Sequence, residues 1–252
     1  MAKGSGLGAS LFVAQYDLSG DIGAITSASS SRATQSVAAI NQLAEDRIVL
    51  RKDGALAFNS YWNVVAGQAH PVLSALPTTD RIVSYFHGST VGNPAASMVS
   101  KLIDYAPAFG ADGSLVVTNT AEANGYALEW SGGGTGDGML TTGLQSFATG
   151  TVSGTSIDLG ATSTLFGAAA YLHCTVMPSG TLTVTVEDSA NDIAFSTVTG
   201  MVFTNLTAPG SERVQGAVGA TVRRYVRVTC SGTHGTASVA VNFIRYLTSS
   251  AA

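Results

Sequence analysis

The sequence has few charged residues. Asp, Glu, Lys and Arg make up 11% of the 252 residues, with a formal net charge of −4. So few charges cover an ordinary free surface poorly, and we expect neighbouring molecules to hide part of it. No run of Lys and Arg interleaved with aromatic residues is present. This argues against a protein that reads a nucleic-acid sequence but leaves a passive contact open.

Long apolar segments and cysteines are also scarce. The start, MAKGSGLGASLFVAQYDL, lacks the apolar core of a secretory signal, and the longest weakly polar run, LFGAAAYLHCTVM, is too short to span a bilayer. We therefore expect a protein that is made in a cytoplasm and does not cross a membrane. Cys174 and Cys230 are too few for a disulfide scaffold and lie in strand-like segments. This predicts buried, reduced thiols that can still be neighbours in space.

Signatures of catalysis and metal binding are missing. The GxSxG, HExxH and CxxC spacings do not occur, and GSGLG at 4–8 precedes a strand instead of following one, as a dinucleotide-binding loop would. The four histidines are scattered, and His173 and Cys174, as neighbours on a strand, would point to opposite faces. The sequence therefore predicts no enzymatic activity, no metal and no cofactor.

Two acidic stretches have both a chemical and a structural interpretation. EDSAND, residues 187–192, offers several oxygens for calcium, but Asp and Asn are also ordinary turn formers, and we predict a turn. In YDLSGDIGAI, Asp17 and Asp21 bracket a Ser-Gly pair. We interpret this stretch as a strand end, a turn at residues 19–20 and an extended segment from Ile22, not as an acid/base or metal pair.

What the sequence does contain is a succession of short alternating runs bounded by Gly, Asn, Asp and Pro, which is typical of antiparallel sheets. Helical periodicity is scarce. Residues 69–76 suit one short helix, and Asn41 can cap a brief turn that runs to Arg47. We therefore predict a mostly β fold. In the first half the strand candidates are residues 11–16, 34–39, 55–64, 81–88, 97–105 and 115–122.

The second half has cleaner alternation. TLTVTVE, YVRVTC and ASVAVNFIRY each alternate between apolar and polar residues, which predicts half-buried strands of a β-sandwich or jelly roll. The glycine-rich SGGGTGDG at 131–138 has the composition of a linker or mobile loop. We predict a β-sandwich or barrel domain over residues 1–138 with a flexible N-terminal arm, a linker over 139–154, and an outer β-sandwich domain over 155–252.

TVRRYVRVTC carries a local basic cluster. Alternation places Arg223, Tyr225 and Arg227 on one face of this strand, and Arg224 on the other face with the valines. We interpret the cluster as a solvated strand face. The alternative is a contact of the outer domain with a ligand or a neighbouring subunit.

Several consecutive motifs of the first half occur together in one known family. They are GLGASLFVAQYDLSGDIG, then AEDRIVLRKDGALAFNSYWN as a short helix, a basic-Asp-Gly turn and a strand, then GQAHPVLSALPTTDRIVSYFHGSTVGNPAASMVSKLIDYAP and FGADGSLVVTNTAEANGYALEW. Over most of residues 9–130 the chain resembles the major tail tube proteins of long non-contractile-tailed (siphovirus-like) actinobacterial bacteriophages. NSYWNVV at 59–65 departs from the family pattern, which has a more aromatic and acidic strand end.

The second half is similar to the β-sandwich domain that many of these phage proteins carry, and to discoidin-like and carbohydrate-binding jelly rolls. VEDSANDIAF and RRYVRVT carry this similarity. The alternative function is therefore a β-sandwich module that binds carbohydrate or another host-surface structure. Sugar platforms usually offer exposed Trp or Tyr, and no Trp follows Trp130.

The family resemblance implies a virion protein of the tail, assembled in the host cytoplasm and without catalytic residues. It implies homo-hexameric rings that stack into a tube, contacts with other tail proteins such as the tape measure and terminator proteins, and ejection of DNA through the tube without sequence-specific binding.

A conduit for DNA should expose few basic groups, because each phosphate contact adds affinity that slows passage. Residues 1–150 hold 11 acidic and 7 basic side chains, and residues 151–252 hold 5 of each. If Leu115, Val117 and the apolar face of 55–64 pack inside, the opposite face is polar. We predict that this polar set lines the lumen: Asn59, Asn63, Thr118, Thr120 and Glu122.

Overall fold

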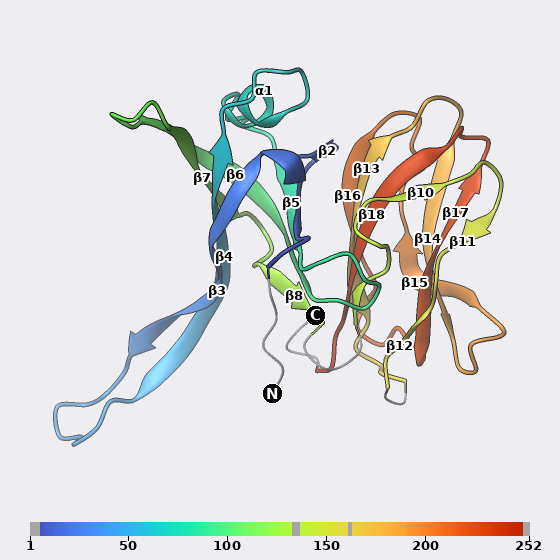
Figure 1. Cartoon of the computed structure of the whole chain (residues 1–252). Helices are drawn as coiled ribbons and strands as arrows, with labels where there is room; N and C mark the ends of the chain where they lie inside the picture. The colour runs from blue at the N-terminus through green and yellow to red at the C-terminus, as the bar shows by residue number, and fades with distance from the viewer. Residues whose placement is uncertain (1–5, 133–136, 161–162, 249–252) are drawn as a thin grey trace. The chain divides into compact units, whose positions relative to one another are not determined.

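The computed structural model describes residues 6–132, 137–160 and 163–248. Regular structure in these residues is almost entirely antiparallel β-sheet, with one short helix, α1 (Ala69–Leu73), and one 3-10 turn, η1 (Ser19–Asp21) (Figure 1). The prediction of a mostly β protein is confirmed. The chain divides into two compact units: residues 21–80 and 98–129, hereafter the sheet unit, and residues 1–20, 81–97 and 130–252, hereafter the sandwich unit.

The sheet unit consists of four antiparallel strands in the order β6-β7-β4-β3. Their bounds are Ile22–Ser36 for β3, Arg47–Tyr61 for β4, Ala95–Phe109 for β6, which begins in the sandwich unit, and Leu115–Ala123 for β7. Leu56 and Phe58 of β4 and Val117 and Ala121 of β7 are buried on one face, and the residues between them point the other way. Apolar alternation therefore makes these stretches central strands.

The turn predicted around Lys52, Asp53 and Gly54 is wrong. β4 runs straight through these residues, and Asp53 pairs with Ser31 of β3. The glycine serves packing instead, because a Cβ on Gly54 would lie 2.4 Å from the backbone nitrogen of Leu128. The chain reverses over residues 37–46, so the turn expected to run to Arg47 ends where β4 begins.

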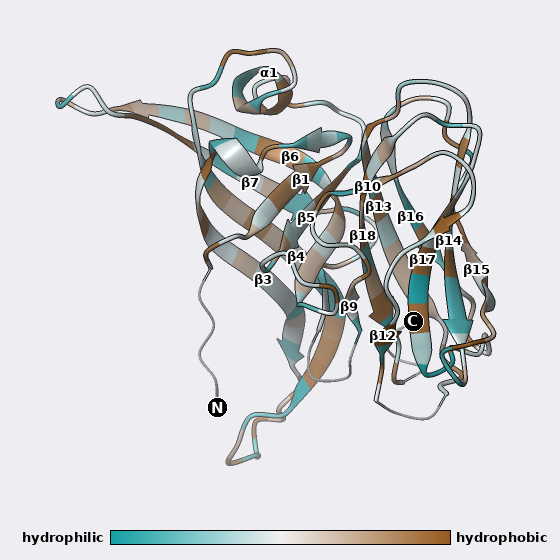
Figure 2. Ribbon diagram, turned by 45° about the vertical axis from the view of Figure 1, so that its right-hand side comes forward, coloured by the Kyte–Doolittle hydropathy of each residue, from teal (hydrophilic) through white to brown (hydrophobic). Residues whose placement is uncertain are grey.

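The sandwich unit contains two five-stranded sheets. The first consists of β9 (Gly138–Met139), β10 (Gln145–Phe147), β13 (Ala168–Val176), β16 (Gly210–Gln215) and β18 (Ala237–Arg245). The second consists of β11 (Val152–Ser153), β12 (Ile157–Asp158), β14 (Leu182–Ser189), β15 (Ser196–Val202) and β17 (Tyr225–Gly232). Apolar residues of both sheets form one core, to which TLTVTVE contributes Leu182, Val184 and Val186 as its alternation predicts. Figure 2 shows hydrophobic segments in the strands of both sheets.

Segments of the first half complete the sandwich unit. They are β1 (Ser10–Val13), β2 (Tyr16–Asp17), β5 (Arg81–Phe86) and the start of β6. Phe12 and Phe86 share a buried cluster with Met139 and Ala240. The compact units therefore differ from the predicted division at 138 and 155, because apolar residues far apart in sequence share a core. Residues 139–154, predicted as a linker, supply β10 and β11, which pair with β18 and β17.

A chain of buried hydrogen bonds runs through the sandwich unit. In order, it joins the carbonyl of Ala14 to His173, Ser84, Ser97, Asn242 and Ser131. The two ring nitrogens of His173 lie 2.7 Å from the Ala14 oxygen and 2.7 Å from Ser84 Oγ. Burial lowers the pKa of His173 to about 4, so the ring is neutral at neutral pH. The predicted structural role of this histidine fits its position.

Candidate functional site

The polar face of the sheet unit brings together most of the predicted lumen residues. Across the β4–β7 ladder, Asn59 stands opposite Thr118, Ala57 opposite Thr120 and Ala55 opposite Glu122. These side chains are exposed or half-buried, whereas their neighbours in sequence are buried on the other face. Small and neutral residues dominate this face, as the alternation of both strands predicts.

Asn63 is not part of this face. It follows the end of β4, its Nδ2 donates to Asp21 Oδ1 at 2.8 Å, and its Oδ1 accepts from the backbone nitrogen of Val65 at 3.1 Å. Asp21 Oδ2 in turn accepts from the first amide of α1, at Ala69, at 2.9 Å. Asn63 therefore holds the connection to the helix. The sequence placed it on the strand because β4 was expected to run to residue 64.

Lys101 adds a basic group to the polar face, where it pairs in register with Glu122. Its Nζ lies 2.7 Å from Asp80 Oδ1. The hydrogen bond from Lys101 lowers the pKa of Asp80, so this carboxylate stays ionised at neutral pH and offsets the charge of the lysine. The face therefore presents little unbalanced positive charge to an approaching phosphate.

Strand β3 lies at the end of the strand order, so it has an open edge over its 15 residues. It is almost wholly exposed, and its sequence, IGAITSASSSRATQS, contains one charged residue and no proline. Natural edge strands are normally protected by charges, proline or bulges. The pairing of β3 with β4 shifts register at three places, and no strand among the described residues pairs with the outer edge of β3. Within the described part of the chain, residues 26–35 therefore pair with β4 alone.

The β3–β4 hairpin also exposes a cluster of large apolar side chains, here called the hairpin tip. Its members are Val37, Ile40, Leu43, Ile48, Val49 and Leu50. In Figure 1 the outer half of this hairpin extends away from the other strands of the sheet unit. This arm is not predictable from alternation, because the stretch 37–50 lacks the period of a half-buried strand.

Arginines of the sandwich unit are engaged within the chain. Arg223 Nε donates to Asp188 Oδ1 at 2.7 Å, and its backbone nitrogen donates to Asp188 Oδ2 at 2.7 Å. Arg227 pairs with Glu187 at 2.8 Å and lies over the ring of Phe195. Tyr225 is half-buried and is covered by the guanidinium of Arg224, 5.1 Å from its ring centre. Arg223, Tyr225 and Arg227 thus make contacts within the chain, and the choice between a solvated strand face and an outer-domain contact stays a prediction.

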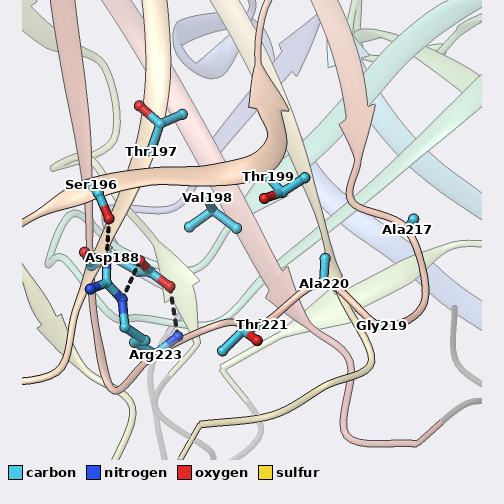
Figure 3. Close-up of a pocket in the computed structure, with 10 residues that line it drawn as sticks. All are labelled: Asp188, Ser196, Thr197, Val198, Thr199, Ala217, Gly219, Ala220, Thr221 and Arg223. Atoms are coloured by element: carbon cyan, nitrogen blue, oxygen red, sulfur yellow. Dashed lines mark hydrogen bonds and ion pairs between the residues drawn. The ribbon is translucent and has the colours of Figure 1, made fainter.

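A shallow depression of about 510 Å³ lies beside β15. Its lining combines Thr197, Val198, Thr199 and Thr221 with the Asp188–Arg223 pair (Figure 3). Figure 3 shows the guanidinium of Arg223 turned toward Asp188 and Ser196. None of the ten lining residues is aromatic. The depression therefore lacks the stacking platform typical of a sugar site.

The acidic stretches take structural roles. Asn191 Oδ1 accepts from the backbone nitrogens of Ile193 and Ala194, each at 3.1 Å, so EDSAND forms the predicted turn. Asp17 accepts from the backbone nitrogen of Ser19 at 3.0 Å, as a turn residue does. Within residues 6–132, 137–160 and 163–248, no group of three or more His, Cys, Asp or Glu side chains is placed to hold a metal ion.

Both cysteines are buried and unbonded. Burial raises the pKa of Cys174 to about 11 and that of Cys230 to about 12. Neither thiol is therefore a reactive nucleophile at neutral pH. Among the described helices, none has the length and apolar character needed to cross a bilayer.

No protein-family model and no curated protein matches the chain. Among solved structures, it is similar to the SPP1 Dit (gp 19.1) protein, described as a paradigm of the hub adsorption apparatus in phages that infect Gram-positive bacteria, with a TM-score of 0.32 and 8% identity over 94% of this chain and 99% of the other. It is also similar to a chain of the phage p2 baseplate in its activated conformation with Sr, with a TM-score of 0.31 and 8% identity over 94% of this chain and 98% of the other. For the same baseplate with Ca, the TM-score is 0.30 and the identity 6%, again over 94% of this chain and 98% of the other. TM-scores this low do not establish a common fold or function.

Proposed function

We propose that this chain is a structural subunit of a phage tail, which assembles through its sheet unit into hexameric rings that stack into the tail tube and conduct DNA. The observation that carries the proposal is the open edge of β3. A long, exposed, almost uncharged edge strand is a template for pairing with another chain. Pairing between copies would continue the sheet around a ring and close its edges.

Two further observations support this role. The motifs of residues 9–130 resemble those of major tail tube proteins. The polar face around Thr118 carries small neutral side chains, and Lys101 on it is matched by Asp80. A face with little unbalanced positive charge suits a wall that DNA slides past, because it offers the phosphates few counterion-releasing contacts.

Blocking the β3 edge tests the proposal. Negative-stain microscopy of the purified protein should show rings or tubes, and changing Ser29 and Ser31 to Lys should leave a folded monomer, because charges on an edge strand oppose pairing. The control changes Ile193 to Lys, since this exposed residue lies in the sandwich unit. The proposal fails if the unmodified chain stays monomeric at high concentration, or if the Ser29 and Ser31 variant assembles like the control.

Carbohydrate binding by the sandwich unit has less support. Tyr171 and Tyr246 are buried, and Tyr225 is covered by Arg224. These three tyrosines are thus withdrawn from a ligand, whereas Trp130 of the same unit is exposed. A glycan-array signal retained by an isolated subunit, together with an absence of rings, would reverse this preference.

A further inference from the structure

One pair of residues in the sheet unit carries a chemical reactivity that ring formation does not use. Asn124 directly follows the last residue of β7, and Gly125 comes next. None of the other asparagines in the sequence precedes a glycine. The amide carbon of an asparagine side chain is electrophilic and lies within reach of the next backbone nitrogen. A glycine there hinders the approach least, because it has no Cβ.

The turn after β7 leaves this nitrogen accessible. Residues 124–126 are exposed, Gly125 has a φ of +79°, and a Cβ built on it would meet nothing within 4 Å. Among the residues that the structure describes, none accepts a hydrogen bond from the nitrogen of Gly125. The preceding nitrogen, that of Asn124, donates to the carbonyl of Val99 at 2.8 Å and ties the turn to β6. The fold therefore neither covers nor holds the nucleophile.

A second exposed turn with a related sequence is built differently. Asp112 precedes Gly113, and an aspartate can close the same ring as an asparagine, although more slowly. Here the nitrogen of Gly113 donates to the carbonyl of Gly110 at 3.0 Å, and Asp112 Oδ1 accepts from the nitrogen of Ser114 at 3.0 Å. Both reacting groups are thus engaged in the turn. The contrast singles out the pair at 124 and 125.

The side chain of Asn124 lies beside a charged pair of the same unit. Its Nδ2 donates to Asp80 Oδ1 at 2.8 Å, and Lys101 Nζ lies 2.7 Å from the same oxygen. The hydrogen bond from Lys101, and after it the one from Asn124, lowers the pKa of Asp80. A carboxylate in place of this amide would remove a donor from Asp80 and add a second negative charge beside it.

We propose that Asn124 and Gly125 form a site of spontaneous covalent modification, at which the asparagine of the folded protein deamidates. The nitrogen of Gly125 loses its proton and bonds to Cγ of Asn124. The bond from Cγ to Nδ2 breaks, ammonia leaves, and a cyclic succinimide forms. Water then opens the ring at either carbonyl, which gives aspartate or isoaspartate. Water is the sole co-reactant, and no oxidant or reductant takes part.

Deamidation would change the charge balance beside the polar face. Lys101, which pairs in register with Glu122 on this face, now has Asp80 as its partner, and it would then face carboxylates at both 80 and 124. Each modified chain gains one negative charge. The effect on a wall that DNA slides past rests on the proposed function, because added negative charge weakens contacts with phosphate. The modification itself does not depend on that function.

Peptide mapping of the aged protein tests the site. The purified full chain, kept below the concentration of assembly, is incubated under mildly alkaline and mildly acidic conditions and digested, and isoaspartyl methyltransferase labels the isoaspartate. The built-in control is Asn205, which is also exposed but precedes Leu206. Deamidation should be at least tenfold more extensive at Asn124 than at Asn205. It should be faster under alkaline conditions, because the attacking nitrogen must lose its proton.

A matched variant separates this site from others in the same chain. In Asn124→Gln the side-chain amide is retained, but the longer side chain closes the ring less readily, so the acidic species that forms during incubation should disappear from ion-exchange chromatograms. Asn124→Asp carries the charge of the product and should elute with the modified protein. Residue 124 is exposed, so both variants should fold, which circular dichroism checks.

The outcomes distinguish this site from the proposed function. Equal deamidation of Asn124 and Asn205 in the folded chain would overturn the site, as would undiminished formation of acidic species in Asn124→Gln. Deamidation of Asn124 only after unfolding in urea would overturn it as well, because the reactivity is assigned to the folded turn. A chain that never forms rings would contradict the proposed function and leave the site intact, since the mapping uses unassembled protein.

Discussion

At the scale of single residues, the buried hydrogen-bond chain fixes one arrangement of protons. The carbonyl of Ala14 can only accept, so His173 Nδ1 carries the proton and Nε2 accepts from Ser84. Ser84 then accepts from Ser97, which accepts from Asn242. A second proton on His173 would reverse the bond to Ser84 and place a charge in the core. The sequence predicted a structural role for this histidine. The hydrogen-bond chain around it was not predictable, because its members lie up to 159 positions apart in sequence.

This arrangement predicts an acid-sensitive stability. The pKa of His173 falls from 6.5 in the unfolded chain to about 4 in the folded one, so its contribution is complete above pH 6.5 and is lost as the pH falls toward 4. Between pH 7 and pH 5 the free energy of unfolding should fall by about 2 kcal/mol from this group.

Urea unfolding at the two pH values measures the effect. In His173→Gln the same pH change should cost about 2 kcal/mol less than in the unmodified chain, because glutamine does not titrate while other groups still do. Equal losses in the two proteins would show that the protonation of His173 is not coupled to folding.

The arginine pairs of the sandwich unit make a matched comparison. The side chain of Asp188 is 5% exposed and that of Arg223 30% exposed, so Arg223→Ala leaves a buried carboxylate with fewer partners. We expect a loss of about 2–3 kcal/mol in the free energy of unfolding. Arg224 and Asp158 are both nearly half exposed, and Arg224→Ala should change stability little. Thermal and urea unfolding of the two variants would contradict this if their losses were equal.

At the scale of elements, the close packing of β4 against Leu128 depends on Gly54. A methyl group there would lie 2.4 Å from Leu128 N and 2.5 Å from Leu128 Cβ, which is closer than packed atoms approach. Gly54→Ala should therefore destabilise the sheet unit by about 1–3 kcal/mol. Gly20→Ala is the control, since a Cβ there would meet nothing within 4 Å. Chemical denaturation followed by circular dichroism distinguishes them, and a neutral Gly54→Ala would refute the packing role.

The elements also show what sequence patterns can and cannot predict. Alternation located β7 and β14 because one face of each is buried, and it also located β5 and β18, although most residues on both faces of β18 are buried. It failed on β3, where both faces are exposed and Ser and Ala follow no period. The family resemblance placed Gly54 in a turn, because a glycine needed for close approach and one needed for a turn look alike in sequence. The polar face was predictable from the alternation of β4 and β7. Asn63 was assigned to it wrongly, because β4 ends at Tyr61 and not at residue 64.

At the scale of the whole molecule, the compact units join residues from both halves of the chain. The sandwich unit takes β1, β2 and β5 from the first half, and the cluster of Phe12, Phe86, Met139 and Ala240 closes only with both. A composition shift near residue 138 could not reveal this, since the shared core depends on contacts across long sequence separations.

The proposed conduit gives a test that spans the assembly. Thr118 is exposed and Thr120 half-buried on the polar face, so Thr118→Lys with Thr120→Lys should fold and assemble normally while adding two positive charges per subunit to the wall. Each phosphate contact so gained strengthens DNA binding and makes it more salt-dependent: the logarithm of the binding constant falls by about 0.9 more for each unit rise in the logarithm of the salt concentration. DNA should therefore pass more slowly, with the strongest retardation at low salt.

The matched control, Thr118→Asn with Thr120→Asn, should eject DNA at the normal rate. Equal ejection rates for the lysine and asparagine variants, or a Thr118→Cys thiol that a small reagent cannot reach in assembled tubes, would show that this face does not line the passage.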